Sequence, residues 1–162
     1  MGDARATAAL VAQGARVRPT WSAVHEAAAA GGDLEVLRLL VAHGLQLEAR
    51  DVYGKSFAHH LPAVEVLQML PRSGLEAVDS QGVTVGHEAA ATGYPEVLEE
   101  LHSRGYDPRA VDRRGRSVAQ LAAENGHLEV LKQLLAWQAV PKLRKKHISN
   151  REVLDFLKTS EI

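Results

Sequence analysis

Four copies of one short pattern run along the chain. The tripeptide Glu-Val-Leu begins at Glu35, Glu65, Glu96 and Glu129, at intervals of 30, 31 and 33 residues. Two further markers recur in the same order in every interval: an Asp-x-x-Gly element, and a Ser or Thr followed three residues later by His or Gln. A period of this length is typical of a solenoid, in which each repeat packs only against its neighbours.

Each interval has the residues of a tight turn followed by two short helices. Asp51 and Gly54 have the spacing of a turn tip, and Asp79 and Asp112 begin equivalent elements. The Ser or Thr that follows is suited to cap a first, Ala-rich helix, and a second helix rich in Val and Leu begins at Glu-Val-Leu. A Gly stands nine positions after this Glu in three copies and predicts the end of the second helix: Gly44, Gly74 and Gly105.

This pattern resembles the ankyrin repeat, which has a period near 33 and the signature Thr-Pro-Leu-His-x-Ala-Ala. The clearest matches are His25-Glu26-Ala27-Ala28, His87-Glu88-Ala89-Ala90 and residues 121–127. The signature Pro and the Leu after it are missing from all four copies. The resemblance implies an all-α ankyrin-repeat solenoid of helix-turn-helix units joined by β-turn tips. It also implies that the signature His is structural and ties turn to helix and repeat to repeat.

The markers also divide the chain. We expect an N-terminal cap, a degenerate half repeat, at residues 1–19, and a basic connector with a C-terminal capping helix at 141–162. The ankyrin repeats fill 20–140, with approximate bounds of 20–50, 51–78, 79–111 and 112–140.

The second repeat is shorter than the third, and the end of the chain carries a helix signal. Pro62 follows His59-His60-Leu61 at once, so the first helix of this repeat is predicted to be no longer than one turn. The run from Ser149 to Glu152 has the pattern of a capping box, which predicts a closing helix over 150–159.

Composition and motifs exclude several classes of function. Lys and Arg number 19 against 20 Asp and Glu, which argues against a nucleic-acid-binding or membrane-binding protein. The chain has no Cys, which fits a reducing, cytoplasmic location, with the nucleus as an alternative. Hydrolase and phosphate-loop motifs are missing, and His residues one repeat apart are too distant to share a metal. We therefore expect no enzyme, no cofactor and no metal.

The expected function is the binding of another protein. In ankyrin stacks the tips and the exposed side of the first helices form a concave wall that grips proteins, and the resemblance implies the same here. The corresponding positions are Trp21, Val52, Tyr53, Lys55, Gln81, Arg113, Arg114, Arg116, Glu124 and Asn125. Trp, Tyr and Arg most often carry interface energy, and the Arg cluster predicts a partner with an acidic or polar surface. We expect a monomer in the absence of that partner.

The role of such a module stays open between adaptor, inhibitor and assembly subunit. The curtailed second repeat resembles the ankyrin-type inhibitors of cyclin-dependent kinases, which are the alternative function. A substrate receptor of a ubiquitin ligase is a further alternative, although the Cys-bearing box of such receptors is missing after Pro141. The basic stretch 142–146 is either a nuclear-targeting signal or a linker.

Overall fold

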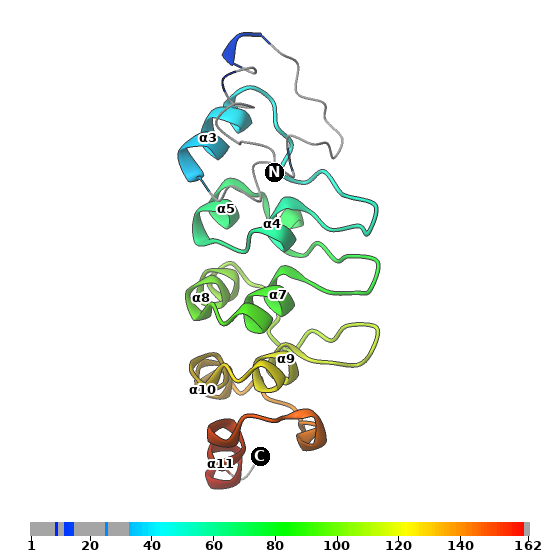
Figure 1. The fold of residues 1–162 in the computed structure, drawn as a ribbon, viewed down its shortest axis with the longest axis vertical. Coiled ribbons are helices and arrows are strands. Elements are labelled where there is room, and N and C mark those ends of the chain that lie inside the picture. The colour runs from blue at the N-terminus through cyan, green and yellow to red at the C-terminus, as the bar shows by residue number, and fades with distance from the viewer. Residues whose placement is uncertain (1–8, 10–11, 15–24, 26–32, 161–162) are drawn as a thin grey trace.

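A computed structural model describes residues 9, 12–14, 25 and 33–160 of the chain. The helices stack repeat upon repeat into an elongated solenoid, with the turn tips projecting along one side (Figure 1). The described residues form no extended strand, but antiparallel bridges join Val78 to Thr84 and Val111 to Ser117 beneath two tips. The predicted all-α solenoid with β-turn tips is therefore confirmed.

The helices form two columns, one next to the tips and one on the side away from the tips (Figure 1). The first helices, nearer the tips, are α4 (Phe57–His60), α7 (Val85–Thr92) and α9 (Val118–Asn125). The second helices are α3 (Leu34–Ala42), α5 (Val64–Met69), α8 (Pro95–Ser103) and α10 (Leu128–Ala136). The other helical segments are α6 (Arg72–Leu75), the 3-10 helix η1 (Lys145–His147) and α11 (Arg151–Thr159).

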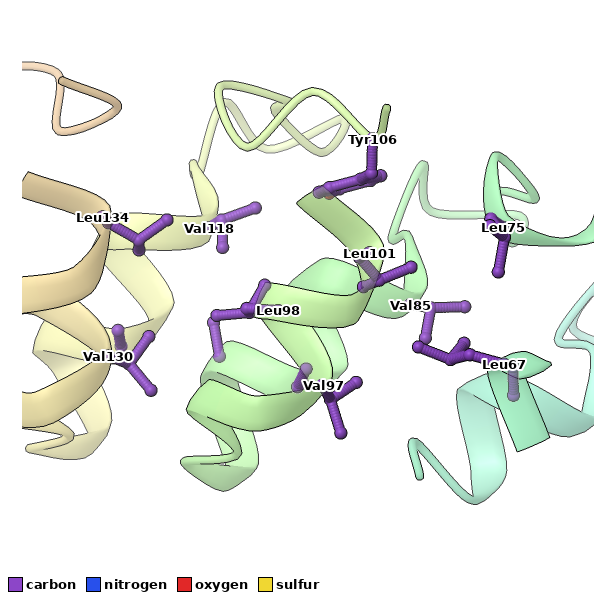
Figure 2. Packing of buried hydrophobic residues seen from close by; sticks show 14 of the residues in the cluster. Leu67, Leu75, Val85, Val97, Leu98, Leu101, Tyr106, Val118, Val130 and Leu134 are labelled. Carbon is purple, nitrogen blue, oxygen red and sulfur yellow. The ribbon is translucent and has the colours of Figure 1, made fainter. Parts of the chain in front are cut away.

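One apolar core runs through the stack between the two columns (Figure 2). The second helices contribute large aliphatic side chains, among them Leu67, Leu98 and Leu131, all fully buried. The first helices contribute Ala, as at Ala89 and Ala122, which lets neighbouring helices approach closely. Each repeat thus buries its apolar face only against its neighbours, and the last repeat needs a cover.

The short second repeat was predicted correctly at its first helix and wrongly at its second. Helix α4 has four residues, as the position of Pro62 predicted. Gly74, however, does not end the second helix but lies inside α6. Helix α5 stops at Met69 because Pro71 cannot continue it, and Leu70 before the proline is extended, with ψ of 142°.

Arg104 of the third repeat compensates for this break. Its guanidinium donates hydrogen bonds to the main-chain oxygens of Leu67 and Leu70, the latter at 2.8 Å. These oxygens lie at the end of α5, where a helix leaves its last carbonyl groups without partners. A side chain from the next repeat therefore replaces the glycine stop of the first and third copies.

The closing helix is present, but its start differs by one residue from the prediction. The N-cap is Asn150, not Ser149: Oδ1 of Asn150 accepts a hydrogen bond from the main-chain N–H of Val153 at 3.1 Å. Asn is at least as good an N-cap as Ser, so the capping-box reading over Ser149 to Glu152 was wrong in register. Helix α11 buries Val153 and Leu157 in the core and covers the last repeat.

Candidate protein-binding surface

An Asp carboxylate holds each described tip in the same shape. In the third repeat, Oδ1 of Asp79 accepts hydrogen bonds from the main-chain N–H groups of Gln81 at 2.7 Å and Val83 at 2.9 Å. Asp51 and Asp112 make the same pair of bonds in their own tips. Burial raises the pKa of Asp112, but hydrogen bonds from the tip outweigh it, and that pKa lies below its ordinary value. The lowered pKa of Asp112 favours the ionised carboxylate, which braces the fourth tip.

The tips are also joined to one another. The N–H of Ser80 donates to the main-chain oxygen of Tyr53 at 2.8 Å, and the N–H of Arg113 donates to that of Gln81 at 2.9 Å. The side chain of Arg113 adds a bond to the oxygen of Ser80 at 2.6 Å. Side chains on successive tips are consequently held at a fixed spacing.

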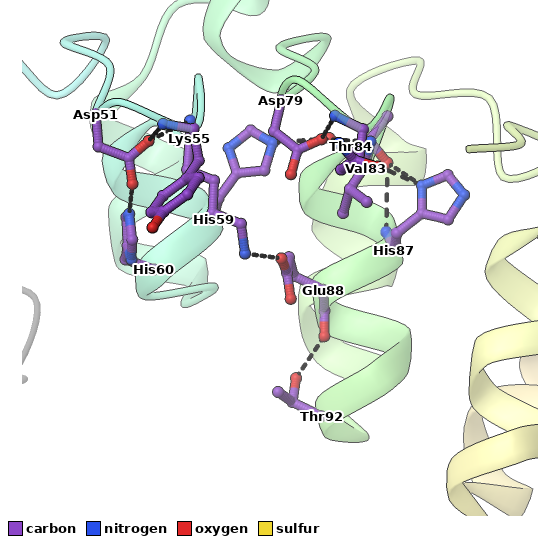
Figure 3. A network of polar contacts seen from close by, with 12 residues as sticks. Asp51, Lys55, His59, His60, Asp79, Val83, Thr84, His87, Glu88 and Thr92 are labelled. Carbon is purple, nitrogen blue, oxygen red and sulfur yellow. Dashed lines mark hydrogen bonds and ion pairs between the residues drawn. The ribbon is translucent and has the colours of Figure 1, made fainter. Parts of the chain in front are cut away.

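The signature His residues tie tips to helices (Figure 3). Nε2 of His59 lies 3.0 Å from the oxygen of Val83 in the next tip, and Nε2 of His87 lies 3.2 Å from the oxygen of Arg116. On the other side of each ring, Nδ1 accepts from the N–H of Ser56 or Thr84 at 3.2 Å. This is the structural role that the resemblance implied.

These imidazoles are buried. Burial lowers the pKa of His25, His59 and His87, which favours the neutral ring. In the fourth repeat Gln120 takes the same position, and its Oε1 accepts from the N–H of Arg144 at 2.7 Å. Within the described ranges no group of three or more His, Cys, Asp or Glu side chains is arranged to hold a metal ion.

A hollow lies between the tips and the first helices. It has a volume of about 370 Å³ and is lined from three successive repeats. Five of the predicted residues line it: Lys55, Gln81, Arg114, Arg116 and Asn125. The structure therefore brings together half of the residues that the sequence assigned to the binding surface.

Two of the cations in this hollow are already paired. Nζ of Lys55 lies 2.7 Å from Oε1 of Glu88 on the next repeat (Figure 3), and Nη2 of Arg116 lies 2.7 Å from Oδ2 of Asp112. The side chain of Arg114 is exposed and has no polar partner among the described residues. It is thus a cation of the hollow that is available to a partner.

The other predicted residues lie around the hollow or outside the described part of the chain. Val52 and Tyr53 are 92% and 66% exposed on the second tip, and Arg113 is exposed on the fourth. Glu124 is half-buried and accepts a bond from Gln120 at 2.8 Å. Trp21 lies outside the described residues.

Sequence reasoning missed Glu88 and Tyr106. Glu88 directly follows the signature His87, and this position in the repeat could have indicated that the Glu88 side chain faces the tips. The hydroxyl of Tyr106 lies 2.6 Å from Oγ1 of Thr84, and burial raises the pKa of Tyr106 to about 12. A side chain on Gly86 would place its Cβ 2.4 Å from this hydroxyl, so the loss of the signature Leu at Gly86 makes room for Tyr106.

Comparison with known proteins agrees with this architecture. The family model for ankyrin repeats (3 copies) matches residues 86–151. No curated protein matches the sequence. Across the described residues, no helix is long and apolar enough to cross a membrane. The stacked helix pairs, the braced tips and the matched segment together show that residues 86–151 are ankyrin repeats and that the described chain has the fold of an ankyrin-repeat solenoid.

Proposed function

We propose that this chain is a non-catalytic module that binds another protein through its concave surface, as an adaptor, an inhibitor or an assembly subunit. By concave surface we mean the tips and the exposed side of the first helices, with the hollow between them. The main support for this proposal is the hollow, which is lined by residues of three successive repeats. Ankyrin repeats in general mediate interactions between proteins.

The rigidity of the tips supports this function. Each tip is closed by an Asp and hydrogen-bonded to its neighbour, so its side chains lose little freedom when a partner docks. A smaller ordering cost leaves more of the contact energy as affinity. We infer that Val52 and Tyr53 are the apolar anchors, because both are large side chains exposed at the end of a fixed tip.

The cations of the fourth tip set the chemistry of the partner. Arg113 and Arg114 are exposed, and charges at the rim of an interface mainly accelerate encounter. We propose a protein partner with an acidic or polar contact surface, met by a monomer of this chain in the cytoplasm. Nucleic acid and membrane are not proposed as partners.

The test is to purify the partner with the tagged chain and to measure binding kinetics at two salt concentrations. We expect Arg113→Glu with Arg114→Glu to slow association and to reduce its salt dependence. Val52→Ala with Tyr53→Ala should mainly speed dissociation, by about tenfold or more if Tyr53 is a hot spot. Tyr94→Ala is the matched control, because Tyr94 is also exposed but lies between α7 and α8, away from the tips. If both tip variants bind like the control, the concave surface is not the site.

A second candidate, inhibition of a cyclin-dependent kinase, is favoured by one observation. Helix α4 has a single turn in the second repeat, whereas α7 and α9 have eight residues each. A curtailed first helix at this place is the feature that resembles the kinase inhibitors. Direct binding to a purified cyclin-dependent kinase, lost on Val52→Ala with Tyr53→Ala, would support this role. Lack of binding at micromolar concentration would exclude it.

A further inference from the structure

Two basic segments that are distant in the sequence meet at the C-terminal end of the stack. The main chain of Arg144 is bonded to Gln120 on α9, through its N–H at 2.7 Å and its oxygen at 3.5 Å. A methyl group placed on Gly115 in the fourth tip would lie 3.2 Å from Nη2 of Arg144. The connector therefore takes the place of a fifth tip, directly beside the fourth.

This junction concentrates positive charge. Residues 107–116 and 141–147 contain eight Lys and Arg and two Asp, a formal charge of +6. Because the whole chain carries −1, all its other residues together carry −7. We call the cations of these two segments the C-terminal basic surface: Arg109, Arg113, Arg114, Arg116, Lys142, Arg144, Lys145 and Lys146.

Most of these cations are not used by the fold. Asp112 is engaged by Arg116 and by the N–H groups of its own tip. The side chains of Arg114, Arg144, Lys145 and Lys146 are exposed, and none has an ion pair or hydrogen bond within the described part of the chain. Like charges gathered without partners repel one another and lower stability. Folding alone does not account for their presence.

We propose that the C-terminal basic surface binds an acidic, extended segment of a partner protein. The inference rests on the proposed function and names the chemistry of part of the contact. An extended chain rises about 3.3 Å per residue and points alternate side chains to the same face. A segment with acidic side chains at every second position therefore presents successive carboxylates on one face, toward the fourth tip and Arg144, whose guanidinium lies against Gly115 of that tip.

A nucleic acid fits this surface less well, for two reasons. A long polyanion would extend past the basic surface onto a molecule whose other residues carry −7, whereas a short acidic segment ends within it. Aromatic platforms for bases are also missing from the described part of this region. Tyr106 is buried, and Trp137 stacks on His102 with ring centres 4.2 Å apart.

The experiment uses the full chain and a fluorescein-labelled peptide of about ten residues, with Glu at every second position and Gly or Ser between. A peptide with Gln in place of Glu is the control ligand. Arg114→Glu with Arg144→Glu is the test variant. Its matched control is Arg38→Glu with Arg72→Glu, which changes the net charge equally at exposed positions of α3 and α6. Circular dichroism confirms that each variant is folded.

We expect the acidic peptide to bind the parent and the matched control equally, and the test variant at least about tenfold more weakly. Raising salt from about 50 mM to about 200 mM should weaken binding, and the Gln peptide should not compete. Amide NMR shifts should concentrate at residues 113–116 and 144–147. Equal binding by the test variant and the parent would overturn the proposal. Tighter binding of a single-stranded oligonucleotide of similar length would also overturn it and indicate a nucleic-acid surface.

Val52→Ala with Tyr53→Ala separates this inference from the proposed function. These residues are on the second tip, so the variant should bind the acidic peptide normally. If it loses the purified partner while the parent fails to bind the peptide, only the basic surface is refuted. If it keeps the partner while peptide binding depends on Arg114 and Arg144, only the anchoring role of Val52 and Tyr53 is refuted.

Discussion

Replacing His59 and His87 together by Gln should remove a large part of the acid sensitivity of this fold. In each ring, Nε2 faces a main-chain oxygen and must donate, and Nδ1 accepts from a main-chain N–H. Protonation of Nδ1 would point a second N–H donor at that main-chain N–H. The charged ring would therefore lose this hydrogen bond, and because it is buried it would also lack hydration. Burial accordingly lowers the pKa of both groups below 6.5.

The sign and size of the effect follow from linkage. Above pH 6.5 both rings are neutral in the folded and unfolded chain, and the stability they contribute is constant. Below pH 6.5 the unfolded chain binds protons that the folded chain does not, so stability falls as the pH falls. For a ring that stays neutral in the fold, the loss at pH 5.5 is up to about 1.4 kcal/mol, or about 3 kcal/mol for the pair.

Urea unfolding followed by circular dichroism at pH 7.5, 6.5 and 5.5 measures this loss. Gln120 shows that an amide is accommodated at this position of a repeat, so the double variant should fold. At pH 7.5 it should be less stable than the parent, by about 1 kcal/mol for each altered hydrogen bond. Its loss of stability between pH 7.5 and 5.5 should be smaller by up to about 3 kcal/mol. An unchanged pH dependence would refute the reasoning.

Three further predictions concern stability. Gln138 has φ of 54° where the first and third repeats have Gly, so Gln138→Gly should stabilise by about 1 kcal/mol and raise the melting temperature; an unchanged or lower value would contradict this. Gly86→Ala should destabilise the fold by about 1–3 kcal/mol, because the new methyl group would clash with the hydroxyl of Tyr106. Adding Tyr106→Leu should recover part of this loss, measured by denaturant unfolding. Additive effects of the two changes would show that the residues are not coupled. Truncation after Pro141 removes α11 and should destabilise the fold, by about 1.5–3 kcal/mol for each of the two side chains that this helix buries. If gel filtration and thermal melting show an equally stable monomer, α11 is not a cap.

Local patterns predicted the stack because each one acts within a few residues. An Asp-x-x-Gly element closes its own turn, as the bonds of Asp79 to its tip show. Pro62 limits α4 whatever the rest of the chain does. The period between such elements then indicates the solenoid, since helix pairs of this length have only their neighbours to pack against.

The features that sequence reasoning missed depend on contacts between repeats. Gly74 looked like a helix stop, but Pro71 had already ended α5, and Arg104 from the next repeat donates to the main-chain oxygens at the end of this helix. The pairing of Lys55 with Glu88 joins residues 33 positions apart. The meeting of Gly115 with Arg144 depends on how the connector folds back after α10. None of these contacts has a marker within its own repeat.

The same limit applies to the binding surface. The positions on the tips and first helices could be assigned from the repeat alone, and five of them line one hollow. The sequence did not show which of their charged side chains have an ion-pair partner. Arg114 and Arg116 are two residues apart, yet among the described residues Arg116 has an ion pair and Arg114 has none, because the side chain of Arg116 reaches Asp112.

Hydrogen exchange of the chain, alone and bound to its purified partner, tests most directly whether the concave surface is the binding site. We expect binding to slow amide exchange at the tips, in residues 52–55, 80–83 and 113–116, and to leave the second helices α5, α8 and α10 unchanged. The tips are the part of the stack that a protein in the hollow would cover. Slower exchange confined to the second helices, with unchanged tips, would show that the partner docks on the opposite side of the stack and would contradict the proposed function.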